Sequence, residues 1–499
     1  MKSTFKVLGI IALAAIIGFA PAGCGDPEGG LTGTPPDPLA MAKAELQTAI
    51  SAATAAKAAV GTPTVIAGWT EGTLTSAGAC VVGAAAADIP VGLKAVAADP
   101  ASAIEAYGTA ITAAQAALDS AATVAEASQA KDDLDAATIT FNAALGTAGT
   151  KSLKARIAAA TGTITIYLYG DENFAGVTSA NIANKTITLE GVGAERTITL
   201  SSAGRMFYLG VNGKLTLNAN VTLKGFAANN TVVVNVNAST AVLTMNDGSK
   251  ITGNMRLTTD DSGSGVAIHN GTFNMTGGEI SDNHAPLEGG SGVRIYSYNG
   301  TSTFNMSGGI ITGNTGTHGG GVFMNSENNG ASIFTMSGGT ISGNIADVGG
   351  GVMVNNRSLR ESSGGGINTF TMTGGTISGN TAAVIGGGVF VQTQQNLNSG
   401  STTFTMSGDS TISGNTAAYG GGLAILKASL VKTGGAITGN TATVSTPVST
   451  AAVLVLAEEN EEGAVAYRDT GAGAGDNITV TWNSSSSQYT TLSGVTAIP

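Results

Sequence analysis

Two different hydrophobic patterns divide the chain. From about residue 38 to 147 the sequence is rich in alanine and has the composition of helices. After Lys151 apolar and polar residues alternate instead, as in Thr163-Ile164-Thr165-Ile166, which is the period of a strand with one buried face. The sequence therefore predicts a small Ala-rich α-helical domain over residues 39–150, followed by an all-β domain.

Local signals set the ends of three predicted helices in the first domain. One helix is expected from about residue 39 to 60. Asp99 followed by Pro100 offers an N-cap and a proline at the first helical position, which starts a second helix. Thr123 and Glu126 have the spacing of a capping box, so a third helix should begin there and end at Gly146. The expected role of this domain is that of a spacer or cap.

An internal repeat dominates the second domain. Its clearest copy reads Phe-Thr-Met-Ser-Gly-Gly-Thr-Ile-Ser-Gly-Asn over 334–344, followed by Gly-Gly-Gly-Val-Met-Val over 349–354. The Asn that closes the first half recurs at spacings of 25 to 36 residues. These positions are Asn254, Asn283, Asn314, Asn344, Asn380, Asn415 and Asn440. A period of this size denotes an array of stacked units.

Each repeat offers three short strands, Phe-x-Met, x-Ile-x and Val-x-Val, separated by glycine-containing corners and one loop of variable length. Because side chains alternate along a strand, Phe334 and Met336 must share a face, and Ile341 joins them inside. The aromatic residues should then stack from coil to coil: Phe273, Phe304, Phe334, Phe370 and Phe404. The asparagines should bond backbone and one another at a tight turn, which gives them a structural role. The predicted fold is a right-handed parallel β-helix, a solenoid of about ten coils over 160–445, with a C-terminal cap over 446–499.

The repeat units resemble those of spirochaete-type β-helix surface lipoproteins and, more distantly, those of the chlamydial polymorphic outer-membrane proteins. The resemblance rests on the Phe-Thr-Met-Ser-Gly-Gly-Thr-Ile-Ser-Gly-Asn-Thr-Ala pattern together with Gly-Gly-Gly-Val, and it covers roughly residues 160 to 445. It implies display at the cell surface, often in adhesion. It does not identify a ligand.

The N-terminus has the pattern of an export signal. Lys2 and Lys6 precede an apolar run from Val7 to Ala20 that is too short to span a bilayer as a mature helix. Ala22-Gly23-Cys24 resembles a bacterial lipobox, although Pro21 stands where that family usually has leucine. We expect a signal peptide over 1–23, lipidation at Cys24, a flexible tether over 24–38 and a location in the outer membrane, facing the cell surface. The alternative is an ordinary cleavage site and a secreted protein.

Charge and composition narrow the partners. The formal net charge is -11, and no cluster of Lys or Arg follows the first six residues, so the chain has no basis for electrostatic capture of nucleic acid. A host or neighbour-cell protein or a neutral glycan is the expected partner, besides the membrane itself. Cys80 lies in an apolar stretch and should be a small buried residue. His269, His284 and His318 stand alone without metal-ligand spacing, so we expect no metal and no cofactor.

One surface stands out as a candidate contact site. If the valines of the third strand point inward, then Arg294, Phe323, Met353 and Phe390 line up outward on successive coils. Large apolar residues exposed at one-strand spacing commonly mark a contact site. The alternative is that a loop or the helical domain covers them.

Parallel β-helices also include polysaccharide lyases and glycoside hydrolases, which makes an enzyme the competing hypothesis. Asp260-Asp261, Arg294-Ile295 and His318-Gly319 faintly resemble polygalacturonase elements, but their order along the chain differs from that of the family. Hydrolysis also needs a paired acid and base. The candidate carboxylates lie on different turns: Asp282, Glu288, Glu327 and Asp347. We therefore expect a protein that works by binding, adhesion or passive display, without catalysis.

Overall fold

The computed structural model describes residues 37–60, 64–67, 69–72, 79–97, 100–176, 179–258, 263–287, 289–356, 365–393, 400–444, 453–456, 464–468, 476–483 and 488–497. These residues form two compact units that divide near residue 150, with the short segments 70–72 and 90–92 belonging to the second unit. The predicted signal peptide, Cys24 and nearly all of the tether lie outside the described residues.

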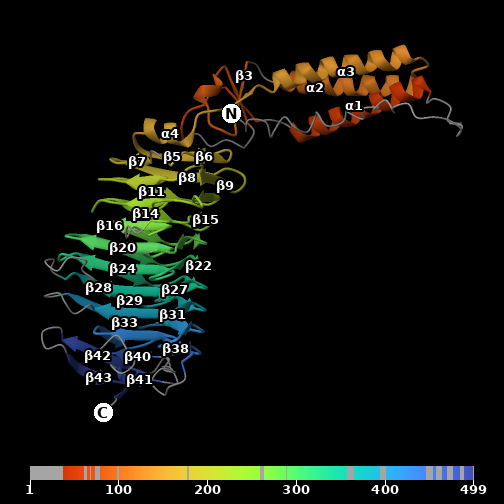
Figure 1. The fold of residues 1–499 in the computed structure, drawn as a ribbon. Coiled ribbons are helices and arrows are strands. Elements are labelled where there is room, and N and C mark those ends of the chain that lie inside the picture. Colours follow the sequence, from red (N-terminus) through yellow and green to blue (C-terminus); the bar gives the residue numbers. More distant parts are fainter. Residues whose placement is uncertain are drawn as a thin grey trace, which may run out of the picture. The chain divides into compact units, whose positions relative to one another are not determined.

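The first unit contains three long helices, α1 (Pro38–Val60), α2 (Ala101–Ser120) and α3 (Val124–Ala144) (Figure 1). They pack through a cluster that includes Leu46, Ile50, Tyr107, Leu134 and Phe141. The rings of Tyr107 and Phe141 stack with centroids 4.2 Å apart. The capping box is confirmed, because the Glu126 amide donates to Thr123 Oγ1 and the Glu126 carboxylate accepts from the Thr123 amide. Gly146 follows α3 with a φ of 77°, as the predicted helix end requires.

A small sheet in the first unit was not predicted. It consists of β1 (Val65–Ile66), β2 (Cys80–Val82), β3 (Lys94–Val96) and β4 (Thr147–Ala148), and a 3₁₀ turn, η1 (Ala86–Asp88), lies between β2 and β3. Strands of two or three residues are too short to produce a readable alternation. Cys80 is buried in β2, which confirms the prediction made for it.

The second unit is a right-handed parallel β-helix, as the repeats predict (Figure 1). Each coil passes through sheet 1, then sheet 2, then sheet 3, and the next coil adds one strand to each sheet. Sheet 1 consists of β5 (Gly162–Leu168), β8 (Lys185–Gly191), β11 (Lys214–Leu217), β14 (Val242–Met245), β17 (Thr272–Met275), β21 (Thr301–Met306), β25 (Ala331–Met336), β29 (Ile367–Met372), β33 (Ser401–Met406) and β37 (Ser429–Lys432), and it ends in β42 (Ile478–Asn483) and β43 (Gln488–Ser493). Sheet 2 consists of β6 (Glu172–Phe174), β9 (Arg196–Leu200), β12 (Val221–Lys224), β15 (Ser249–Thr252), β18 (Glu279–Ser281), β22 (Ile310–Thr312), β26 (Thr340–Ser342), β30 (Thr376–Ser378), β34 (Thr411–Ser413) and β38 (Ala436–Thr438).

Sheet 3 closes each coil. It consists of β7 (Ala180–Ile182), β10 (Phe207–Leu209), β13 (Val234–Val236), β16 (Val266–His269), β20 (Val293–Tyr298), β24 (Val322–Glu327), β28 (Val352–Asn356), β32 (Val389–Thr393), β36 (Leu423–Leu426) and β40 (Val453–Leu456), and it ends in β41 (Ala464–Arg468) and β44 (Thr496–Ala497). A fourth, six-stranded sheet joins the middle and later coils between sheets 2 and 3, and the three-strand repeat did not predict it. This sheet 4 consists of β19 (His284–Ala285), β23 (Thr315–Gly316), β27 (Ile345–Val348), β31 (Thr381–Ile385), β35 (Thr416–Ala417) and β39 (Thr441–Ala442).

The predicted stack of phenylalanines is confirmed. Phe304, Phe334 and Phe370 pair in register in sheet 1, and all are fully buried. Ring centroids along the row from Phe273 to Phe404 are 4.8, 4.7, 4.6 and 4.7 Å apart. The core of these five coils is thus built by repeating one contact.

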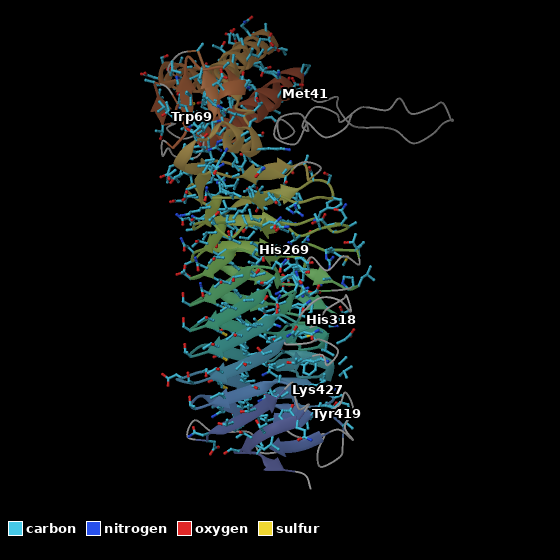
Figure 2. All side chains as sticks on the ribbon, turned by 90° about the vertical axis from the view of Figure 1, so that its left-hand side faces the viewer. Met41, Trp69, His269, His318, Tyr419 and Lys427 are labelled. Carbon is cyan, nitrogen blue, oxygen red and sulfur yellow. The ribbon has the colours of Figure 1, made fainter. Side chains whose placement is uncertain are left out.

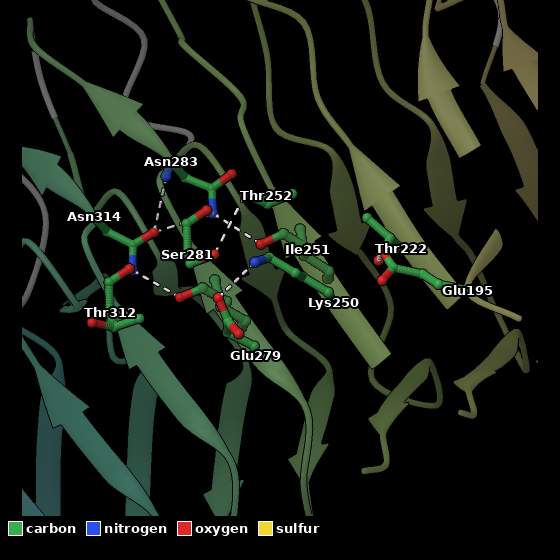
Figure 3. Close-up of polar contacts among 11 residues, drawn as sticks. Glu195, Thr222, Lys250, Ile251, Thr252, Glu279, Ser281, Asn283, Thr312 and Asn314 are labelled. Carbon is green, nitrogen blue, oxygen red and sulfur yellow. Dashed lines mark hydrogen bonds and ion pairs between the residues drawn. The ribbon is translucent and has the colours of Figure 1, made fainter. Parts of the chain in front are cut away.

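The asparagine ladder is also confirmed. Asn344 Nδ2 donates to Oδ1 of Asn380 at 2.9 Å, and its Oδ1 accepts from Nδ2 of Asn314 at 3.0 Å. The same amide also donates to the backbone oxygen of Ile311 in the preceding coil at 2.9 Å. Figure 3 shows one rung of this ladder, between Asn283 and Asn314. Each buried asparagine therefore ties neighbouring coils together.

Both ends of the stack have their own covers. Before the first coil, helix α4 (Leu153–Ala159) buries Leu153 and Ile157 in the same core cluster as the coils. After the last coil, β42 pairs antiparallel with β37, and β41 pairs antiparallel with β40. A change of strand direction therefore ends the parallel stack in sheets 1 and 3 and covers the edges of β37 and β40.

Candidate functional site

The structure aligns the predicted contact patch but does not expose it. Arg294 in β20, Phe323 in β24, Met353 in β28 and Phe390 in β32 are register partners on the outward face of sheet 3, as predicted. Their exposed fractions, however, are only 0, 5, 3 and 4%. The prediction of an accessible apolar patch is therefore wrong.

A second column of side chains buries this row. Val348, Ile385 and Tyr419 pack against Phe323, Met353 and Phe390, and the ring of His318 stacks on Phe323 with centroids 5.5 Å apart. Figure 2 shows His318 and Tyr419 on the same side of the stack. Each of these covering residues stands directly before a glycine with positive φ, such as Gly349 at 63°, so the chain turns back tightly. The outward row thus forms a secondary core between sheets 3 and 4, which continues through Ala424 and Leu454.

Arg294 contributes to this packing. Its guanidinium carbon lies 4.1 Å from the ring centroid of Phe323 and 5.5 Å from that of Tyr296. These are cation–π distances, and the side chain is fully buried. Arg294 is therefore not available on the surface as a contact residue.

The carboxylates considered for catalysis fall at separate places in the coil. Asp282 is an exposed residue with a φ of 54° between β18 and β19, and Asp347 is exposed in β27. Glu327 is buried at the far end of β24, where the chain leaves sheet 3. Glu288 and the Asp260-Asp261 pair lie outside the described residues.

The histidines are also dispersed. His269 ends β16 and meets Tyr296 edge-on, with ring centroids 5.6 Å apart. His284 is half-buried in β19, and His318 Nδ1 lies 3.0 Å from the hydroxyl of Thr317. Among the described residues, no group of three or more His, Cys, Asp or Glu could hold a metal ion.

Charged side chains on the outward face of sheet 2 pair with neighbours (Figure 3). Lys250 Nζ lies 2.8 Å from Glu279, and the hydroxyl of Thr222 donates to Glu195 at 2.7 Å. Partial burial raises the pKa of Glu279, but hydrogen bonds from Lys250 and Ser281 and the charge of Lys250 outweigh it and leave the pKa below its ordinary value. These contacts join neighbouring strands of sheet 2 in the earlier coils.

Sheet 1 carries a regular surface feature that the sequence analysis missed, a face of threonine side chains. Two outward rows run along the ten parallel strands from β5 to β37, and thirteen of these twenty positions are threonine. We define the threonine face by Thr163, Thr165, Thr186, Thr188, Thr216, Thr244, Thr272, Thr303, Thr335, Thr369, Thr371, Thr403 and Thr405. The other seven positions are Lys214, Val242, Asn274, Asn305, Ile333, Ser429 and Val431.

The hydroxyls of the threonine face are available. Within the part of the chain that the structure describes, none of these threonine side chains takes part in a hydrogen bond. The amides of Asn274 and Asn305, in contrast, bond each other at 2.9 Å. All of the threonines except Thr163, which is exposed, are half-buried between their stacked neighbours, so the rows are held in place. The sequence did contain the signal for this face, because the residues between the inward Phe and Met positions point outward.

Two further observations bear on location and relatives. None of the described helices is long and apolar enough to cross a membrane. Comparisons with protein-family models, with curated proteins and with solved structures found nothing that matches this chain.

Proposed function

We propose that this protein is a lipid-anchored protein of the outer membrane that faces the cell surface and acts by binding, in adhesion or passive display, rather than by catalysis. The observation that carries the proposal is the threonine face. It is a rigid, repeated and almost uncharged surface on the outside of the β-helix, with hydroxyls that no described side chain engages. A surface of this kind suits contact with a partner and supplies no acid–base pair for a reaction.

The N-terminal sequence supports the location. Ala22-Gly23-Cys24 resembles a lipobox, and the Gly- and Pro-containing stretch up to Pro38 is suited to a tether. A lipid on Cys24 would hold the chain at a membrane through a covalent anchor. The repeat pattern, similar to that of spirochaete-type surface lipoproteins, points in the same direction.

Anchoring and display are tested in the native cell. The wild type should incorporate an alkynyl fatty acid, and Cys24→Ser should lose both the label and the membrane association. External protease should degrade the protein on intact cells while a periplasmic marker survives. An unlabelled wild type, or a Cys24→Ser variant that stays in the membrane, would show that Cys24 is not the anchor. Protection from external protease would show that the protein is not on the surface.

Binding is tested with beads coated with the purified chain. We expect the beads to attach to immobilised polysaccharides or extracellular-matrix proteins more than beads coated with heat-unfolded chain do. Release of reducing or unsaturated sugars from a polysaccharide panel by the purified wild type would instead assign the protein to the β-helix enzymes. Attachment without sugar release supports the binding function.

A further inference from the structure

We infer that the threonine face is the ligand-binding surface and that its ligand is a neutral polysaccharide chain lying along the stack of coils. This inference rests on the proposed binding function and adds the site and the ligand class. It replaces the apolar row of Phe323, Met353 and Phe390, which is covered.

The geometry of the face is that of a regular lattice. Register partners such as Thr335, Thr371 and Thr405 follow one another at one strand spacing, ~4.8 Å. The second row, two residues earlier on each strand, runs parallel to the first at ~6.6 Å. Such a surface presents at least one threonine in every coil from β5 to β33. An extended chain of six-membered sugar rings also repeats one unit over a comparable length, so successive sugars can meet equivalent partners.

The chemistry of the face matches a sugar. A threonine side chain offers a hydroxyl that donates and accepts hydrogen bonds, beside a methyl group. A neutral sugar likewise presents hydroxyls beside apolar C–H groups. Since the threonine hydroxyls have no hydrogen bond among the described residues, binding breaks no internal bond of the protein.

Charge selects a neutral polymer over a charged one. Of the twenty positions in the two rows only Lys214 is ionisable, so the face offers a single charge to a charged chain. The protein as a whole carries a formal charge of -11, which repels polyanions. Binding should therefore change little with salt concentration.

The threonine face is rigid and repeated, so many weak contacts with one polymer can add up to a high affinity. The rows are fixed by parallel pairing and by the phenylalanine stack beneath them, so little ordering cost remains on binding. Each coil adds a similar weak contact, and linked contacts on one polymer strengthen one another. A long polysaccharide should consequently bind far more tightly than a short oligosaccharide.

The competing explanation is that threonine simply suits the solvent side of strands. Sheet 2 provides a control for it within the same molecule. Its outward positions in the later coils also carry threonine, at Thr340, Thr376 and Thr411. In the earlier coils, however, the same row carries Lys250 and Glu279. The uncharged part of sheet 2 therefore covers fewer coils than the threonine face does.

The experiment is co-sedimentation of the purified wild-type chain with cellulose, chitin and an insoluble β-1,3-glucan, with alginate beads as the charged probe. The test variant removes hydroxyls but keeps shape and strand preference on sheet 1: Thr335→Val, Thr369→Val, Thr371→Val, Thr403→Val and Thr405→Val. The control variant makes the same exchange on sheet 2: Thr340→Val, Thr376→Val and Thr411→Val. Circular dichroism and gel filtration establish that both variants are folded and monodisperse.

We expect the wild type to bind at least one neutral polysaccharide, and the sheet 1 variant, which lacks five hydroxyls, to bind it at least about tenfold more weakly, a loss of about 1.4 kcal/mol. The sheet 2 variant should bind as the wild type does. A third variant with serine at the same five positions of sheet 1 should bind closer to wild type than the valine variant.

Three results would overturn the inference. They are equal binding by the wild type and the sheet 1 variant, binding only to alginate, and no binding to any of the probes. An assay of ice recrystallisation tests one further possibility. If the wild type inhibits recrystallisation but binds no polysaccharide, the threonine face binds ordered water instead. If coated beads still attach to a protein surface, the binding function stands and only the ligand class falls. If nothing binds in either assay, the proposed function falls as well.

Discussion

Replacement of Asn344 with alanine should destabilise the β-helix by about 4 kcal/mol, because the two amide hydrogens and the side-chain oxygen make four full hydrogen bonds of about 1 kcal/mol each. The Asn344 amide nitrogen donates to Ile311 O at 2.9 Å, Ser342 O at 3.1 Å and Asn380 Oδ1 at 2.9 Å. Its Oδ1 accepts from the backbone N and from Nδ2 of Asn314, at 3.1 and 3.0 Å. The Asn314 backbone N would lose its acceptor inside the core, whereas Asn380 Oδ1 would keep the bond from the Asn344 backbone N, and Asn314 Nδ2 would keep its bonds to Ile280 O and Thr312 O.

Asn344→Asp sharpens the test. At neutral pH a carboxylate oxygen would replace the donor nitrogen and face three acceptor oxygens inside the core, so the loss should exceed that of the alanine variant. Burial and these acceptors favour the protonated acid, which places the folded-state pKa above the unfolded-state value. The penalty should therefore shrink as the pH falls, a dependence that the alanine variant lacks.

The assay for both variants is amide hydrogen exchange followed by mass spectrometry on peptides spanning 331–356, combined with guanidinium unfolding. These peptides lie in the β-helix, so they do not respond to the helical unit. The control is Asn305→Ala, which removes one amide bond of 2.9 Å on the solvent side of sheet 1 and should cost under about 1 kcal/mol. If Asn344→Ala exchanges and unfolds like Asn305→Ala, the ladder does not stabilise the stack and the reasoning fails.

Four other predictions test the core, its cover, a corner and the N-terminal cap. Phe334→Ala should lower the free energy of unfolding by about 3–5 kcal/mol, and a thermal melt like that of wild type would refute the stacking. Phe323→Ser should cost a similar ~3–5 kcal/mol because the residue is buried, whereas an unchanged melt would mean that it is exposed. Gly351→Ala would place a Cβ 2.6 Å from the backbone oxygen of Gly388, so we expect a loss of about 1–3 kcal/mol or more on guanidinium unfolding, and none if the corner can widen. The Glu172 carboxylate accepts a hydrogen bond from the Leu153 amide at the start of α4, and burial raises the pKa of Glu172 above the unfolded-state value. Stability should therefore rise as the pH falls from above the raised pKa to the ordinary carboxyl range, and Glu172→Gln should flatten that dependence in denaturant titrations.

The interior of the β-helix could be predicted because the alternation of inward and outward positions repeats from coil to coil. Alternation within Phe-x-Met assigns Phe334 to the inside, and the repeat places the same residue above and below it. The closing asparagines recur with the period of a coil, so their ladder follows from the same count. The two- and three-residue strands of the first unit repeat nothing, and β1 to β4 therefore left no pattern to read.

The outside of the β-helix was harder to predict because alternation gives direction but not accessibility. Phe323, Met353 and Phe390 do point away from the main core, as predicted, yet Val348, Ile385 and Tyr419 fold over them. The signal for that cover is the apolar residue that precedes each glycine triplet. Its meaning depends on the positive φ of the first glycine, which only the structure reveals.

The difference between the direction of a side chain and its accessibility also explains why sheet 1, rather than sheet 3, carries the proposed site. The outward row of sheet 3 changes from arginine to phenylalanine, methionine and alanine along the stack, because each coil must fit its own cover, and the result is a buried apolar layer. Sheet 1 has no described cover over its two rows, and there the outward side chains stay short, polar and alike over most of the coils. Packing explains variety under a cover, whereas a row in solvent favours both strand preference and a polar group, and threonine supplies both. Thirteen threonines and Ser429 place a hydroxyl at fourteen of the twenty positions, and this regularity is the feature that binding would use. The exchange of threonine for valine on sheet 1 separates the two demands, because it keeps strand preference and removes only the hydroxyl.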